Sequence, residues 1–221
     1  MDKADVTIVV VPRDNFSSAR ESLESIYANT DTRFSLLYID GGSPRDIAQY
    51  LKDAAKKRQF RIIRTEEYLS PNHARNIAVR HIDTRYVVFV DNDVIVAPGW
   101  LDALVQCAER TGAASVCPLT YEERQHNREM LHYAGGDARI VVVEENSRIE
   151  RHMVYGINTR TIAPSAHKTE LLEFHACLVC ADAYRAVGGM DEKLLSSRDN
   201  FEALRGKRWT NLAAPPHRTS L

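Results

Sequence analysis

Residues 86–93 read YVVFVDND, an apolar run of five residues that passes directly into two aspartates separated by one asparagine. A continuous run of β-branched and aromatic residues is typical of a strand buried on both faces of a sheet. The run VTIVVV at 6–11 has the same character and stops at Pro12, which cannot donate a hydrogen bond to a neighbouring strand. These two runs predict central strands of an α/β sheet.

Working outward from these runs, strands and helices are expected to alternate over the first 120 residues. Further strands are expected at 34–39, 60–64 and 114–119, and helices at 17–28, 46–57, 71–82 and 98–110. Such alternation indicates βαβ units and a mostly parallel sheet with helices on both faces. The less regular remainder is expected to hold strands at 140–144 and 174–181 and a short helix at 182–187. With 221 residues, the chain suits one α/β domain spanning 1–221.

Composition narrows the possible classes of protein. The net charge of -1 and pI near 6.7 give no electrostatic reason to expect nucleic-acid binding. No apolar run approaches the ~18 residues of a transmembrane helix, and the acidic N-terminus does not resemble a signal peptide. We therefore expect a cytoplasmic protein, with peripheral membrane association left open. The glycine-rich dinucleotide fingerprint, the P-loop and the G-x-S-x-G hydrolase motif are all absent from the sequence.

The four cysteines, Cys107, Cys117, Cys177 and Cys180, are too few for a disulfide framework. Cys177 and Cys180 have the CxxC spacing of zinc and redox sites. Their Leu-Val filler, inside an apolar run, favours a buried strand in which cysteine acts as a small hydrophobic residue.

Three polar clusters directly follow predicted strands: Pro12-Arg13-Asp14, Asp40-Gly41-Gly42-Ser43 and Asp91-Asn92-Asp93. In open α/β sheets, ligands bind beyond the carboxyl ends of the strands, so these clusters are expected at one edge of the sheet. The carboxylates of Asp91 and Asp93 suit Mg²⁺ or Mn²⁺, which also bridge phosphates. The alternative is a plain turn, because aspartate and asparagine both favour turns.

Five motifs in this order resemble family 2 glycosyltransferases of the GT-A fold. They are a first strand ending in Pro12, the Asp40 turn with Gly42-Ser43, Ala74-Arg75-Asn76, the Asp-x-Asp of 91–93, and Gly188-Gly189-Met190-Asp191-Glu192. The resemblance extends from Val6 to Leu204 with a gap in the middle. It implies a single domain with a central, mostly parallel mixed sheet flanked by helices, in which 1–120 is the nucleotide-binding half and 121–221 the acceptor side.

The resemblance also assigns roles to residues at the sheet edge. Pro12 and Arg13 would line a base pocket, and Asp40 would contact the base. Asp91 would lie near the ribose and share with Asp93 the binding of a Mn²⁺ or Mg²⁺ that bridges two phosphates.

Two further residues belong to the implied nucleotide site. Asn92 lies between the two aspartates and is included with them. Arg75 would brace the nucleotide pocket, and its alternative role is an internal ion pair with Asp40 or Asp91.

The implied reaction moves a sugar from a nucleoside-diphosphate sugar to a hydroxyl of a glycan, lipid or protein, with inversion. In the family, the base is the second residue of a Glu-Asp pair after Gly-Gly-x-Asp-Glu. Here that pair is Asp199-Asn200, and an amide cannot accept the proton. Asp199 is the candidate base, and Asp191 and Glu202 are the fallbacks.

Asn200 also keeps open a catalytically inactive module that binds a nucleotide sugar or a glycan. A nucleotidyltransferase is disfavoured, because residues 12–15 lack the glycine-rich basic loop of that class. His175 and His217 are possible extra metal or phosphate ligands, although a histidine beside an apolar strand is more often structural.

Overall fold

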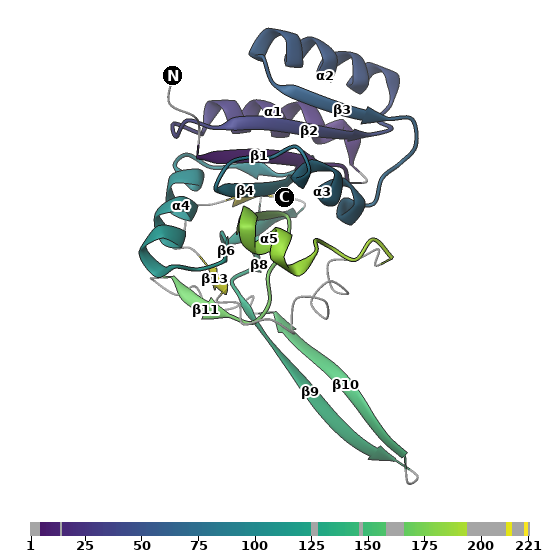
Figure 1. Ribbon diagram of the computed structural model, residues 1–221, viewed down its shortest axis with the longest axis vertical. Coiled ribbons are helices and arrows are strands. Elements are labelled where there is room, and N and C mark those ends of the chain that lie inside the picture. Colours follow the sequence, from purple (N-terminus) through teal and green to yellow (C-terminus); the bar gives the residue numbers. More distant parts are fainter. Residues whose placement is uncertain are drawn as a thin grey trace.

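A computed structural model describes residues 5–13, 15–124, 128–145, 148–157, 166–193, 211–213 and 219–220. An eight-stranded sheet forms its centre, in the order β11-β13-β6-β12-β4-β1-β2-β3 (Figure 1). Its strands are β1 (Val6–Val11), β2 (Ser35–Gly41), β3 (Arg61–Thr65), β4 (Tyr86–Asp91), β6 (Ser115–Cys117), β11 (His167–Thr169), β12 (Ala176–Cys180) and β13 (Asn211–Ala213).

The centre of this sheet is parallel, as the sequence predicts. β1 pairs in parallel with both β2 and β4, so that Val10 lies between Tyr38 and Val90. β2 continues in parallel to β3, whereas β12 runs antiparallel to β4 and to β6. Because β1, β2 and β4 point the same way, the segments that follow them emerge at the same edge of the sheet.

Helices cover both faces of the sheet, which accounts for the continuous apolar runs. On one face, α1 (Ala19–Ala28), α2 (Arg45–Arg58) and α4 (Trp100–Thr111) pack with side chains such as Ile8 and Val88. On the other, α3 (Pro71–Val79) and α5 (Ala181–Val187) pack with Val9 and Phe89. Successive residues of β1 and β4 therefore enter different apolar clusters, and both strands are buried along their whole length.

Local signals set the ends of several helices. Ser70 caps α3 by accepting a hydrogen bond from the His73 amide, and Pro71 occupies the first turn, where no amide donor is needed. The 3-10 turn Phe16–Ser18 leads into α1. Gln59 ends α2 in the left-handed region, with φ of 58°. The helix expected at 71–82 is shorter than predicted, because the chain leaves the helical path after Val79.

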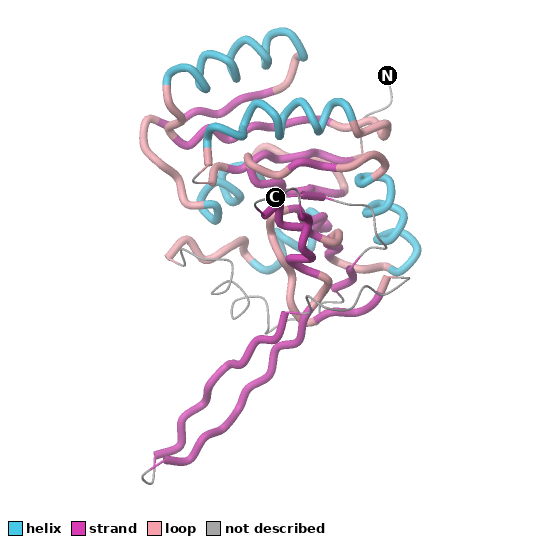
Figure 2. Tube along the Cα trace, turned by 180° about the vertical axis from the view of Figure 1, so that it is seen from behind, coloured by secondary structure: helices cyan, strands magenta, loops and turns pink. Residues whose placement is uncertain are grey.

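The second half of the chain departs more from the sequence prediction. A four-stranded sheet has the order β5-β14-β7-β8 and contains β5 (Ile95–Val96), β7 (Thr120–Arg124), β8 (Arg128–Tyr133) and β14 (Thr219–Ser220). The strand expected at 140–144 is part of the longer β9 (Gly136–Glu145), which pairs with β10 (Arg148–Ile157). Together they form a ribbon that projects from the rest of the molecule (Figures 1 and 2).

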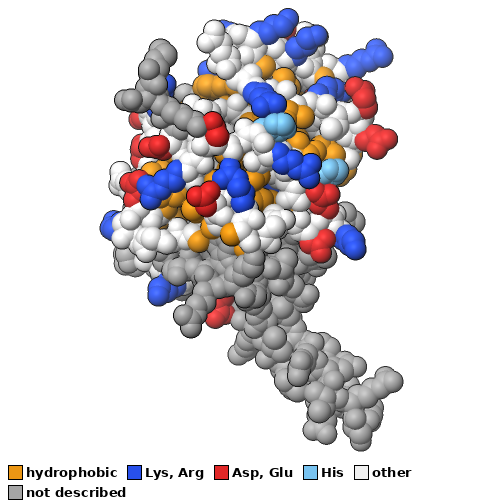
Figure 3. Space-filling view, viewed as in Figure 1, with side chains coloured by type: hydrophobic (Ala, Val, Ile, Leu, Met, Phe, Trp, Pro, Cys, Tyr) orange, Lys and Arg blue, Asp and Glu red, His pale blue; other side chains and the backbone are white. Residues whose placement is uncertain are grey.

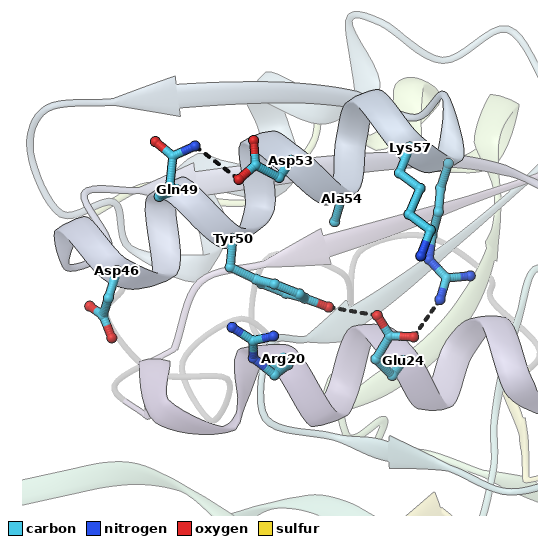
Figure 4. A pocket seen from close by; sticks show the side chains of 9 residues that line it. Arg20, Glu24, Asp46, Gln49, Tyr50, Asp53, Ala54 and Lys57 are labelled. Atoms are coloured by element: carbon cyan, nitrogen blue, oxygen red, sulfur yellow. Dashed lines mark hydrogen bonds and ion pairs between the residues drawn. The ribbon is translucent and has the colours of Figure 1, made fainter.

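A polar groove of about 490 Å³ lies between α1 and α2 (Figure 4). Several of its polar groups pair with one another. The Tyr50 hydroxyl donates to Glu24 at 2.8 Å, Arg58 forms an ion pair with Glu24, and the Arg20 guanidinium lies 4.0 Å from the centre of the Tyr50 ring. We therefore assign these residues to the packing of the two helices.

Cys177 and Cys180 lie in β12, and all four cysteines of the chain are free, so the structure agrees with the buried-strand interpretation of the CxxC spacing. No helix among the described residues is both long and apolar enough to span a bilayer. Basic and acidic side chains are interspersed over the described part of the face in Figure 3. That distribution agrees with the near-zero net charge.

Two neighbouring residues of α2 test the packing of this helix on the sheet. Leu51 is fully buried, whereas Lys52 is exposed. We expect Leu51→Ala to lower the free energy of unfolding by about 2–5 kcal/mol, because it removes buried methyl groups and leaves a cavity. Lys52→Ala should change it by less than about 0.5 kcal/mol. Urea denaturation measures both, and equal effects would contradict the packing described here.

Candidate functional site

Asp91, the last residue of β4, is buried, and two arginines and a histidine surround its carboxylate. Arg13 Nε lies 3.3 Å from Oδ2, Arg75 Nη2 lies 3.3 Å from Oδ1, and His175 Nδ1 lies 3.0 Å from Oδ2. The Asp91 amide also donates to the His175 carbonyl at 2.9 Å. A buried carboxylate is costly unless it is paired, and these partners offset that cost. They come from the end of β1, from α3 and from the segment before β12.

Arg75 is the most deeply buried of these cations, with a side chain only 3% exposed. Burial lowers the pKa of its guanidinium, and the negative charge of Asp91 opposes that shift. Arg75 also donates to Asn72 Oδ1 at 3.2 Å and to the Phe174 carbonyl at 3.4 Å, and it lies 4.9 Å from the centre of the Phe174 ring. Of the two ion pairs considered from the sequence, the one with Asp91 is therefore present.

Asp40 at the end of β2 has a different arginine as its partner. Its Oδ1 accepts from the Ser43 amide at 3.0 Å, and its Oδ2 forms an ion pair with Arg64 of β3. The parallel register places Asp40 opposite Arg64. A Cβ on Gly41 would lie 3.0 Å from Pro12 Cγ, so the ends of β1 and β2 are in close contact. Pro12 and Asp40 are thus brought together at the sheet edge.

Asn92 and Asp93 continue from Asp91 but differ in environment. Asn92 is buried and accepts a hydrogen bond from the Arg13 amide at 2.8 Å through its Oδ1. Asp93 is half-buried, and among the described residues no cation lies within ion-pair distance of its carboxylate. Burial, followed by the charge of Asp91, raises the pKa of Asp93. The triplet therefore joins one carboxylate held in direct ion pairs to one that has no ion-pair partner among the described residues.

The Gly188-Gly189-Met190-Asp191-Glu192 turn is fixed to α3 through Asn76. Asn76 Nδ2 donates to the Met190 carbonyl at 2.8 Å, and Asn76 Oδ1 accepts from the Met190 amide at 2.9 Å. Gly189 has a φ of +83°, and a Cβ there would lie 2.6 Å from Asn76 Oδ1. Only glycine fits so close to that amide. Adjacent residues of α3 thus hold this turn and, through Arg75, Asp91.

Asp191 is exposed within this turn, and its Oδ1 accepts from the Lys193 amide at 2.9 Å. Asn72 of α3 donates to its carbonyl at 2.9 Å. The other candidate bases, Asp199 and Glu202, lie outside the described residues, as do Asn200, His217 and Asp14 of the first polar cluster.

His175 has closer links to the site than its sequence context indicated. Its Nδ1 contacts Asp91, and its Nε2 lies 3.4 Å from Glu173 Oε1. Burial opposes the charged imidazole, but the hydrogen bond to Asp91 and the charges of both carboxylates together raise the pKa of His175. The sequence left His175 as a lone histidine, because only the pairing of β12 with β4 brings it to Asp91.

The partners Arg64 and Asn76 were not identified as such from the sequence. Finding Arg64 requires the register of β2 and β3, which short strands do not specify on their own. Asn76 did carry a signal, since it belongs to the Ala74-Arg75-Asn76 motif.

Replacing Asp91 with a neutral residue and replacing Asp93 in the same way should have opposite effects on the free energy of unfolding. Asp91→Asn leaves Arg75 buried beside a neutral group and should lower the free energy of unfolding by about 3–5 kcal/mol. Asp93→Asn removes a carboxylate whose charged form is disfavoured in the folded protein, and should raise the free energy of unfolding at neutral pH. Urea denaturation at low ionic strength separates the two, and a destabilised Asp93→Asn variant would contradict this account of the triplet.

The comparisons with known proteins agree with this geometry. The family model "Glycosyl transferase family 2" matches residues 7–166. The pre-mycofactocin glycosyltransferase of Mycobacterium tuberculosis is 24% identical over 198 residues, covering 88% of this chain and 37% of that protein. The chain spans between 13% and 37% of the length of the curated relatives it matches.

Two solved structures are similar in fold. GalNAc-T7 with UDP, GalNAc and Mn²⁺ has a TM-score of 0.72 at 16% identity, covering 98% of this chain and 43% of that one. The mannosyltransferase PcManGT from Pyrobaculum calidifontis, in complex with GDP-Man and Mn²⁺, has a TM-score of 0.67 at 13% identity, covering 100% and 57%. With its mostly parallel sheet and the family match over most of its length, this chain belongs to glycosyl transferase family 2 and has the GT-A fold.

Proposed function

We propose that this glycosyltransferase moves a sugar from a nucleoside-diphosphate sugar to an acceptor hydroxyl, with a divalent cation and with inversion. The observation that carries the proposal is the contrast between Asp91 and Asp93. Two arginines and a histidine contact the Asp91 carboxylate, whereas no cation among the described residues lies within ion-pair distance of the Asp93 carboxylate, two residues later. Such a carboxylate at the carboxyl edge of a sheet suits a bound cation.

The donor nucleotide is proposed to bind along the ends of β1, β2 and β4. Pro12 and Arg13 line the base pocket, Asp40 contacts the base, and Asp91 lies near the ribose. This placement is supported by the contacts of Asp40. The Ser43 amide and the Arg64 guanidinium bind its carboxylate and so fix its orientation. Arg75 and Asn92 act in this proposal by holding Asp91 and Arg13 in place.

The hard oxygen ligands of the triplet fit Mn²⁺ or Mg²⁺. Asp93 is the principal ligand in this proposal, and Asp91 contributes from its buried position. When bound, the cation acts as a Lewis acid that stabilises the charge developing on the departing nucleoside diphosphate. The raised pKa of Asp93 supports this role, because a nearby cation would favour the carboxylate that burial disfavours.

Attack by the acceptor requires a carboxylate that removes the proton from its hydroxyl. We assign this role to Asp199, with Asp191 as the described alternative, since the turn that carries Asp191 is anchored to α3. A single displacement inverts the configuration at the sugar carbon. In this proposal residues 1–120 bind the donor and residues 121–221 shape the acceptor side, where a glycan, lipid or protein hydroxyl binds.

An inactive module that binds a nucleotide sugar or glycan is the second candidate. The observation that favours it is Asn200, which stands where the family places its base. Donor binding without hydrolysis or transfer to any acceptor would favour this candidate.

Nucleotide binding is the first test of the proposed donor site. Thermal unfolding would be followed with UDP, GDP and dTDP, each with and without Mn²⁺, because the solved structures with this fold carry UDP in one case and GDP-Man in another. We expect one base to stabilise the protein only with Mn²⁺, by about 2.7 kcal/mol when the ligand is at 100 times its dissociation constant.

The matched variants are Asp93→Asn and Asp31→Asn, the latter in an exposed loop. Asp93→Asn should abolish the Mn²⁺-dependent stabilisation, and Asp31→Asn should keep it. A wild-type protein that no nucleotide stabilises, or an Asp93→Asn variant that responds as the wild type does, would refute the assignment of the donor site.

A further inference from the structure

Three metal-binding side chains meet where the four-stranded sheet approaches the central sheet. His132 comes from β8, and Glu173 and His175 come from the segment that leads into β12. One possible ligand atom from each residue lies within 4.8 Å of the other two. The function proposed above gives His132 and Glu173 no role.

The spacing of His175 and Glu173 matches that of two ligands on one ion. His175 Nε2 and Glu173 Oε1 are 3.4 Å apart. Two ligands at ~2.0–2.1 Å from a tetrahedral Zn²⁺ lie about 3.3–3.4 Å from each other. The His132 ring meets the His175 ring edge-on, with centres 5.3 Å apart. Because all three ligand atoms lie within 4.8 Å of one another, an inward movement of His132 by no more than about 1.5 Å would complete the tetrahedral spacing.

Asp91 fixes which nitrogen of His175 is available to a metal. A carboxylate can only accept a hydrogen bond, so the 3.0 Å contact places a proton on His175 Nδ1. The other ring nitrogen, Nε2, lies on the Glu173 side, 3.4 Å from Glu173 Oε1. A metal-bound histidine commonly donates its other N–H to a carboxylate in this way.

Two imidazoles and one carboxylate favour Zn²⁺ over Mg²⁺ or Mn²⁺, which prefer oxygen ligands. The side chains of Glu173 and His175 are only 14% and 15% exposed, so the position is sheltered from solvent. Three protein ligands leave a fourth position for water, as in zinc sites that are not closed by protein. None of these three ligands belongs to the metal site proposed at Asp91 and Asp93.

We propose that His132, Glu173 and His175 form a second metal site, selective for Zn²⁺ and separate from the site at Asp93. The ion would join β8 to the start of β12. It would also hold His175 in the orientation in which it contacts Asp91, so that occupancy stiffens one side of the Asp91 cluster. The proposal does not depend on donor binding, since the ion is bound without nucleotide.

The test is calorimetric titration of the full chain, stripped with a chelator, with Zn²⁺ in the absence of nucleotide. We expect one Zn²⁺ per chain. His132→Gln and Glu173→Gln should each weaken binding by at least about tenfold, because removing a ligand should cost no less than removing a partner of a ligand. Substitution with Co²⁺ should give the visible absorption bands of a four-coordinate ion, and His132→Gln should abolish them.

Two controls keep the result specific. His81→Gln removes an exposed histidine outside the cluster and should leave Zn²⁺ affinity unchanged. Asp93→Asn should also keep it, although the same variant should lose nucleotide binding with Mn²⁺. The proposal is overturned if the wild type binds no Zn²⁺, if both cluster variants bind it as the wild type does while retaining the wild-type unfolding midpoint, or if Asp93→Asn removes the Zn²⁺ site.

Discussion

The structure around the candidate site depends on one buried carboxylate. Asp91 ends the central strand β4 and accepts contacts from Arg13 after β1, Arg75 on α3 and His175 before β12. These segments are distant in sequence, and each would carry a buried or half-buried charge without Asp91. A paired, hydrogen-bonded cluster of this kind favours one arrangement of these segments. If one segment were displaced, a buried charge would be left without a partner. The sheet edge is therefore held by electrostatic pairing in addition to apolar packing.

The motifs that are separate in the sequence are joined physically through α3. Arg75 faces Asp91, and Asn76 holds the turn at Gly189 and Met190. The Ala74-Arg75-Asn76 motif thus connects the Asp-x-Asp triplet to the Gly-Gly-x-Asp-Glu turn. This explains in structural terms why the two motifs belong together, and why glycine is required at 189, where a larger residue would collide with Asn76.

Sequence reasoning predicted the first half of the fold well, because strands buried on both faces leave long apolar runs and helices leave a clear period. It also placed Asp40 and Asp91 at one sheet edge, a consequence of parallel strands. It missed β5, β7, β8, β10 and β11, which are short or lack continuous apolar runs, and it predicted no strands for the tail that supplies β13 and β14. The pairing of Asp40 with Arg64 and of Asp91 with His175 depends on strand register across distant segments, which composition and spacing do not encode.

The two aspartates of the triplet would respond differently to evolutionary drift. Most substitutions at Asp91 would be removed because they unfold the protein, whatever its activity. Asp93 is held in a form that the folded state disfavours, so substitutions there would be tolerated or even selected if stability alone mattered. In a lineage that had lost its chemistry, Asp93 would be among the first residues of the site to disappear. The fold itself therefore supplies no stabilising reason for an aspartate at position 93.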